Sequence, residues 1–205
     1  MVKKKWQSFF SFSDFRHSPL PLSAYFAALP RLEGKRLMLR PFQRRDSRDV
    51  FAYASDPEVA RYVLWEPHTR LSESRDYIRY NLSLYRSGQP GSWAIVHGES
   101  GRVIGSIGFV WVSRENRSCE VGYSLSRAFW NQGLMSEALS LVIASVFADL
   151  PLDRIEAQCD LRNPASARVM EKSGMFREGV LRRRLWNKGE PVDVALYAIL
   201  RQDLD

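Results

Sequence analysis

A single glycine, Gly133, lies at the point where a strand-like run passes into a helix-like run. The run Glu120 to Leu125 (EVGYSL) has the pattern of a strand, and the apolar residues from Leu134 onwards are typical of a helix. The first backbone N–H groups of a helix have no partner inside the helix, and together they attract an anion. The sequence therefore predicts an anion site at Asn131-Gln132-Gly133, with an ordinary strand–loop–helix connection as the simpler alternative.

A second group of residues further along the chain supports the anion site. Asn163-Pro164-Ala165-Ser166 has the composition of a helix start, because Asn163 can cap the helix and proline fits its first turn. Lys172-Ser173-Gly174-Met175-Phe176 follows, and its glycine marks the end of that helix. Capping uses one side-chain oxygen of Asn163 and leaves its NH₂ group for a ligand, so the residue can be both a cap and a binding residue.

Other kinds of catalytic centre find no support in the sequence. The three histidines are far apart, no spacing of cysteine and histidine resembles a metal site, and the P-loop, GxGxxG and GxSxG motifs are missing. We therefore expect no metal ion in the site. The two cysteines, Cys119 and Cys159, do not make a disulfide framework, and they indicate a reducing, cytoplasmic setting.

The composition predicts one globular domain with an appendage. The chain has 205 residues, 45% of them hydrophobic, and a formal net charge of +7. A basic surface could suit RNA, but no RNA-reading motif accompanies it, so we expect a solvated surface without direct nucleic-acid readout. No apolar run reaches the roughly 20 residues of a membrane span, and we expect no membrane association.

Residues 1–30 are predicted to form a basic, aromatic-rich N-terminal extension, and residues 31–205 the domain itself. The extension is interrupted by prolines, and its aromatic residues argue against plain disorder. These aromatic side chains could contact the domain, a second copy of the chain in a homodimer, or another partner. The apolar run at the start is broken by serines and has no clean cleavage site, so we expect it to be retained.

Hydrophobic periodicity and turn residues predict the elements that position these groups. Strands are predicted at Arg36 to Phe42, Ser92 to His97, Arg102 to Trp111, Ser118 to Leu125, Arg154 to Asp160, Val180 to Trp186 and Pro191 to Leu200. Helices are predicted at Arg45 to Ala54, from Asp56-Pro57, from Ser72 to Gly88, from Leu134 to Leu150 and from Asn163 to Gly174. The last two strands form a hairpin with a bulged turn at Asn187-Lys188-Gly189. This order predicts an α/β (α+β) fold with helices on the faces of a mixed sheet.

Three stretches together carry a family resemblance: EVGYSL, WNQGLMSEA and NPASARVMEKSGMFREG. They resemble the GNAT superfamily of N-acetyltransferases, and within it the ribosomal-protein-alanine N-acetyltransferases. The resemblance covers roughly Arg31 to Leu204. It implies a mostly antiparallel twisted sheet with helices on both faces, acetyl-CoA as co-substrate, and direct transfer of the acetyl group to an amine.

The resemblance also implies roles for individual residues around the cofactor. Tyr123, Ser124 and Leu125 match the strand that pairs with the pantetheine arm of acetyl-CoA. Asn131, Gln132, Gly133, Leu134, Met135 and Ser136 match the loop that binds its pyrophosphate. Asn163 and Ser166 match a pair on the next helix that faces the cofactor. Met135 stands at a position of this loop where a small residue is common, and its side chain is bulkier than glycine.

Acetyl transfer needs a base for the ammonium proton, and an acid can protonate the leaving thiolate. The best base candidate is Glu120, acting through a water molecule, with a paired structural glutamate as the alternative. Glu66, beside Trp65, is a second acid, for which substrate positioning is the favoured role. Asp193 is a weaker candidate.

The sequence departs from many members of the superfamily at the residue that would protonate the leaving thiolate. A tyrosine often stands seven residues after the matching asparagine, but Met170 occupies that position and has no proton to give. Ser166 is therefore the provisional proton donor, with Tyr197 in reserve. Leu185 stands where some protein N-terminal acetyltransferases have a glutamate base.

The resemblance favours a protein N-terminus, such as that of a ribosomal protein, as the acceptor. One alternative is a small amine: a polyamine, an amino acid or an antibiotic. The other is a non-catalytic acyl-CoA-binding module, since a shared fold does not fix the function.

Overall fold

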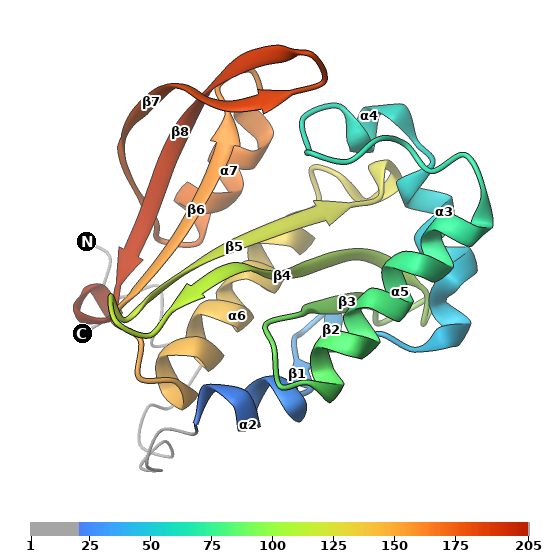
Figure 1. The fold of residues 1–205 in the computed structure, drawn as a ribbon, viewed down its shortest axis with the longest axis horizontal. Coiled ribbons are helices and arrows are strands. Elements are labelled where there is room, and N and C mark those ends of the chain that lie inside the picture. The colour runs from blue at the N-terminus through green and yellow to red at the C-terminus, as the bar shows by residue number, and fades with distance from the viewer. Residues whose placement is uncertain (1–20, 205) are drawn as a thin grey trace.

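The computed structural model describes residues 21–204, so residues 1–20 of the predicted extension lie outside the described part (Figure 1). Its strands are β1 (Leu32–Glu33), β2 (Leu37–Pro41), β3 (Ser92–His97), β4 (Val103–Ser113), β5 (Ser118–Leu125), β6 (Arg154–Asp160), β7 (Phe176–Asn187) and β8 (Glu190–Leu200). Its helices are α2 (Leu22–Ala27), α3 (Ser47–Ala54), α4 (Pro57–Ala60), α5 (Leu71–Arg86), α6 (Leu134–Asp149) and α7 (Pro164–Lys172). Short 3₁₀ turns occur at Arg44–Asp46, Arg127–Phe129 and Arg201–Leu204.

The eight strands form one sheet in the order β1-β2-β3-β4-β5-β6-β8-β7. Every neighbouring pair is antiparallel except β5 and β6, which are parallel. Helices α3 and α5 cover one face and α6 lies behind the other (Figure 1). The predicted α/β class, with a mostly antiparallel sheet and helices on both faces, is confirmed.

The sheet opens between its two parallel strands. Only Ser118–Glu120 of β5 are in register with residues of β6, at Arg154–Glu156. Beyond Glu120 the two strands run apart (Figure 1). The β6-facing edge of the second half of β5 is thus left without a strand partner, and its backbone groups need other partners.

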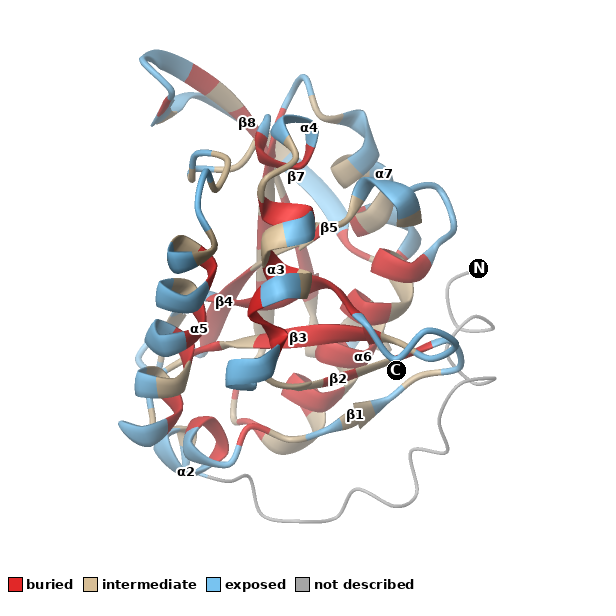
Figure 2. Ribbon diagram, turned by 90° about the vertical axis from the view of Figure 1, so that its right-hand side faces the viewer, coloured by how far each residue is buried: buried red, intermediate tan, exposed pale blue. Residues whose placement is uncertain are grey.

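Helix α6 occupies the centre of the core because its sequence is apolar almost all round. Figure 2 shows the buried residues of α6 and of the central strands. Leu139, Val142, Ile143 and Val146 are fully buried, and burying each such side chain contributes about 1.5–3 kcal/mol. The core therefore fixes α6, and with it the position of the α6 N-terminus.

The described part of the predicted extension packs on the domain. Tyr25 and Phe26 of α2 are almost fully buried, and the Tyr25 hydroxyl lies 2.8 Å from Oγ of Ser145 on α6. The Phe26 ring meets Phe109 of β4 edge-on at 5.1 Å. Residues 21–30 are therefore in contact with the same core that holds α6.

The structure differs from the predicted elements at several places, and helix α2 is one element that was not predicted. The two-residue strand β1 was not predicted, and β7 begins at Phe176, four residues before the predicted start. The predicted bulged turn is wrong. Asn187 pairs with Glu190, which leaves a two-residue turn at Lys188 and Gly189. Both of its residues have positive φ, as the right-handed twist of a hairpin requires.

Candidate active site

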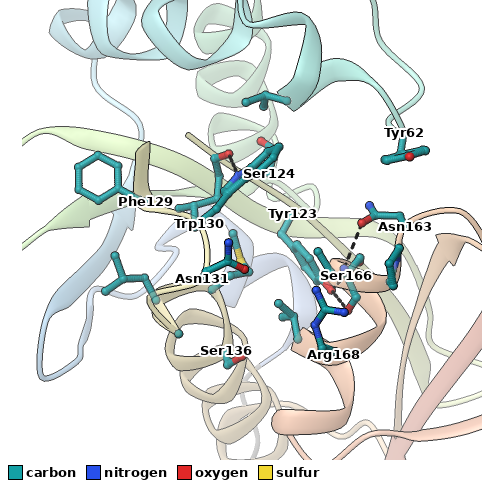
Figure 3. A pocket seen from close by; sticks show the side chains of 18 of the residues that line it. Tyr62, Tyr123, Ser124, Phe129, Trp130, Asn131, Ser136, Asn163, Ser166 and Arg168 are labelled. Atoms are coloured by element: carbon teal, nitrogen blue, oxygen red, sulfur yellow. Dashed lines mark hydrogen bonds between the residues drawn. The ribbon is translucent and has the colours of Figure 1, made fainter. Parts of the chain in front are cut away.

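A cleft of about 570 Å³ lies where the sheet opens. Its walls come from the end of β5, the loop before α6, the first turn of α6, helix α7 with the residues just before it, and the segment around α4 (Figure 3). The cleft brings together most of the residues that the sequence singled out. They are Tyr123, Ser124, Leu125, Asn131, Gly133, Leu134, Met135, Ser136, Asn163 and Ser166.

The mouth of α6 is built by backbone conformation. Gly133 is the N-cap with φ of 74°, a left-handed conformation that glycine adopts without steric cost, and Asn131 is also left-handed at 60°. No side chain caps the helix, so the first-turn N–H groups are left for a ligand. An anion there gains about 0.3–2 kcal/mol from the helix end.

Arg36 holds this loop from outside the cleft. Its Nη1 donates to the Gln132 carbonyl at 2.7 Å, and its Nε donates to Oε2 of Glu137 at 2.8 Å. The Arg36 backbone N–H donates to the other oxygen of Glu137, also at 2.8 Å. The sequence did not indicate this role, because Arg36 and Glu137 lie 101 positions apart. Of the predicted loop residues, Gln132 is absent from the lining, and its side chain bonds the Ala128 carbonyl instead.

Strand β5 and helix α7 meet beside the opening at a pair of hydroxyl groups. The Tyr123 hydroxyl lies 2.9 Å from Oγ of Ser166 and 3.2 Å from its carbonyl oxygen (Figure 3). Burial raises the pKa of Tyr123. Asn163 caps α7 by accepting the Ser166 backbone N–H at 3.2 Å, as predicted for a cap, and its amide remains in the lining.

Glu120 is buried away from the cleft lining. Its two carboxylate oxygens accept hydrogen bonds from Trp111 Nε1 at 2.7 Å and from Gln158 Nε2 at 3.0 Å. Burial raises the pKa of this carboxyl, although both hydrogen bonds oppose the shift. Successive side chains of a strand point to opposite faces of the sheet. Glu120, Gly122 and Ser124 are alternate residues of β5, so their side-chain positions share one face.

The remaining candidates lie outside the cleft. Glu66 is exposed, whereas Trp65 packs partly buried under α3 and α5 and lines a second, smaller cavity. Asp193 accepts the backbone N–H of Arg183 at 2.7 Å, which is a structural contact within the hairpin.

Two residues on and beside α7 are also removed from the cleft. The Tyr197 hydroxyl is buried and donates to Glu171 at 3.0 Å. Met170 is fully buried in the core.

Basic side chains that the sequence did not single out also reach the cleft. Arg162, Arg168 and Lys172 line it from the α7 side. Arg162 is committed to Asp160 and Glu190, at 2.7 Å each. Arg168 and Lys172 add positive charge to the lining. Their spacing of four residues puts them on one face of α7.

The hairpin of β7 and β8 meets α4 across the cleft. The Lys188 Nζ at its turn donates a hydrogen bond to the Ala60 carbonyl at the end of α4. Arg127, before α6, pairs with Asp56 at the start of α4 at 3.1 Å. The segment around α4 is thus connected to both sides of the opening.

Two observations on the described residues concern metal ions and membranes. Within residues 21–204, no set of three or more histidine, cysteine, aspartate and glutamate side chains is arranged to hold a metal ion. No helix in that range has the length and hydrophobicity needed to cross a membrane.

An opened sheet beside an uncapped helix N-terminus is an arrangement that suits an extended anionic ligand. The family of the acetyltransferase (GNAT) domain matches residues 36–176. The uncharacterized N-acetyltransferase p20 of Bacillus licheniformis is 35% identical over 82% of this chain and 95% of its own length. The chain therefore belongs to the GNAT acetyltransferases and is an acyltransferase.

Two further relatives agree with this family. The crystal structure of a GNAT-family acetyltransferase from Bacillus anthracis is 29% identical and superposes with a TM-score of 0.76, covering 84% of this chain and 99% of that one. The ribosomal-protein-serine acetyltransferase of Escherichia coli is 29% identical over 62% of this chain and 69% of its length. The family membership favours an enzyme over the non-catalytic module.

Proposed function

We propose that the protein transfers the acetyl group of acetyl-CoA directly to the N-terminal α-amine of a protein, such as a ribosomal protein. The observation that carries the proposal is the unpaired edge of β5 next to the uncapped N-terminus of α6. An extended chain with amide groups fits the first, and a pyrophosphate fits the second.

The residues present fit such a cofactor. The pyrophosphate would bind the first turn of α6 at Gly133, and Arg168 and Lys172 would add positive charge. The pantetheine amides would pair with the backbone of Tyr123 to Leu125. When bound, acetyl-CoA supplies the activated thioester that the acceptor amine attacks.

Glu120 and the Tyr123–Ser166 pair supply proton transfer in this proposal. Glu120, through a water molecule, takes the proton of the acceptor ammonium, and the neutral amine then attacks the thioester carbonyl carbon. The C–S bond breaks as the new C–N bond is completed. Ser166 gives a proton to the leaving thiolate, and the second proton lost by the amine nitrogen returns to Ser166 through the Tyr123 hydroxyl across their 2.9 Å contact, so both hydroxyl groups end protonated.

The acceptor class is supported by the relationship to the ribosomal-protein-serine acetyltransferase of Escherichia coli. A cytoplasmic reaction fits this acceptor, and it fits the two cysteines, which are both unpaired and buried. The competing acceptor class is a small amine, which uses the same cofactor chemistry and differs only in what occupies the acceptor side.

Two measurements test the proposal in sequence. Acetyl-CoA at one hundred times its Kd should stabilise the protein by about 2.7 kcal/mol, which raises the Tm by about 5–10 °C. Mass spectrometry should then detect acetylation of peptide N-termini when peptides and small amines compete. An absent Tm shift would refute the cofactor, and exclusive acetylation of small amines would refute the acceptor.

A further inference from the structure

A second cavity, of about 120 Å³, lies between the sheet and helices α3 and α5. Six of its lining residues carry polar or aromatic groups: Tyr53, Trp65, His68, Tyr77, Ser106 and Ser124. They come from α3, the loop before α5, α5 itself, β4 and β5. The volume is about four times the share of one liquid water molecule, so it holds only a small group.

The two cavities meet at Ser124, which lines both of them. Neighbouring side chains on a strand point to opposite faces, so Tyr123 bonds α7 while Ser124 faces α3. In the proposed function, the backbone around Ser124 carries the cofactor. A group bound in the second cavity would therefore lie beside the bound cofactor, on the α3 side of β5.

The lining of the second cavity is mostly apolar, with a few hydroxyl groups and one imidazole, and it carries no aspartate, glutamate, lysine or arginine. The hydroxyl groups of Ser106 and Ser124 are 3.1 Å apart, and the Tyr53 hydroxyl interacts with both. Such a lining can hydrogen-bond a neutral group, whereas it offers no partner for a carboxylate or an ammonium ion.

His68 contributes the imidazole ring of the lining, and one of its two ring nitrogens has a hydrogen-bond partner in the structure. Its Nδ1 lies 2.8 Å from Oγ of the fully buried Ser74, and its ring packs beside Trp65 at 5.7 Å. Burial lowers the pKa of His68, which favours a neutral ring. Because Ser74 takes Nδ1, Nε2 is the ring nitrogen left to a ligand; no other bond of this ring occurs in residues 21–204.

We propose that this cavity binds the first side chain of the acceptor, selects a small uncharged residue, and prefers serine to alanine through a hydrogen bond from the serine hydroxyl to His68. The inference rests on the proposed transfer to a protein N-terminus. His68 is a specificity-determining residue in this arrangement, and Trp65 limits the size of the residue that fits.

The test compares peptides that differ only in their first residue. Serine should give a kcat/KM about fivefold above alanine, the ratio that one neutral hydrogen bond commonly contributes. Leucine, phenylalanine and aspartate peptides should fall at least about tenfold below alanine, since the cavity is small and uncharged.

Two substitutions at His68 separate hydrogen bonding from packing. In His68→Gln the amide can replace Nε2, and in His68→Asn it can replace only Nδ1. We expect the serine preference to persist in the first and to disappear in the second. An equal acetyl-CoA-induced Tm shift in both variants shows that each is folded with its cofactor site intact.

Trp65→Ala is a further variant that does not depend on His68. Its partly exposed ring can be removed without emptying the core, and the enlarged cavity should narrow the difference between leucine and alanine peptides at least about fivefold.

Failure of the inference differs from failure of the proposed function. Equal kcat/KM for serine, alanine and leucine peptides would overturn the inference. A serine preference that persists in His68→Asn would overturn the role of His68. Acetylation of small amines but of no peptide N-terminus would overturn the proposed function on which both rest.

Discussion

The hydroxyl oxygen of Tyr123 lies 2.9 Å from Oγ of Ser166, and this contact joins β5 to α7 beside the opening in the sheet. Two hydroxyl groups at this distance can pass a proton from one to the other. In the proposed mechanism this contact takes the place of an acid at Met170, which has no proton to give and whose side chain is buried in the core.

Removing either hydroxyl group should slow the chemical step without weakening the binding of acetyl-CoA. We expect Ser166→Ala to lower kcat by about 100-fold, the lower range for general acid catalysis, and Tyr123→Phe to lower it less. Steady-state kinetics and acetyl-CoA titration measure the two quantities. Ser83→Ala, a serine on the exposed side of α5, is the matched control. Unchanged turnover in Ser166→Ala would remove Ser166 as the proton donor.

Gly133 can be compared with Gly101, because both have left-handed backbone and neither has atoms within 3.5 Å of an added Cβ. Alanine at either position should cost about 1–2 kcal/mol of the free energy of unfolding, as left-handed strain. Only Gly133→Ala should also weaken the binding of acetyl-CoA, by up to about tenfold, because it disturbs the N-terminus of α6. Denaturation and calorimetric titration separate these effects, and equal affinities in the two variants would contradict the anion site.

Arg36 should matter for cofactor affinity more than for stability. Arg36→Ala removes the bond to the Gln132 carbonyl and the pair with Glu137, so acetyl-CoA should bind about tenfold more weakly. The half-exposed ion pair should cost less than about 1 kcal/mol of folding free energy. Arg102→Ala, which breaks a comparable pair with Asp49, is the control and should bind acetyl-CoA normally.

Glu120 predicts a pH dependence of stability with a defined sign. Its folded pKa is raised by burial, whereas in the unfolded chain it is about 4.3. The folded state therefore binds the proton more tightly, and its stabilisation is present below the unfolded pKa and lost as the pH rises through the folded pKa. Urea denaturation from pH 4 to pH 8 should show the stability of the wild type falling relative to Glu120→Gln across this window.

The same variant tests catalysis. If Glu120 takes the ammonium proton, Glu120→Gln should lower kcat by about 100-fold and leave the Kd of acetyl-CoA unchanged. Loss of acetyl-CoA binding would instead assign Glu120 a structural role through Trp111 and Gln158.

The sequence predicted the fold and the mouth of α6 because both are encoded locally. Periodicity marks the strands, and Gly133 marks the turn into an apolar helix. The partners of these elements are not local. Arg36 meets Glu137 across 101 positions, and the lining of the second cavity is assembled from residues of four elements and a loop. The opening between β5 and β6 depends on where parallel pairing stops, which no run of residues specifies.

The opening between β5 and β6 affects which parts of the site can be altered by mutation. Side chains can be replaced by mutation, but the N–H and C=O groups of Tyr123 to Leu125 are present whatever residue occupies those positions, proline excepted. In the proposed complex, recognition of the pantetheine arm belongs to the backbone and is insensitive to most substitutions. The acceptor side has no such protection, because its cavity is lined by side chains. Descendants of one enzyme could therefore keep their acetyl donor while exchanging their acceptors a few residues at a time.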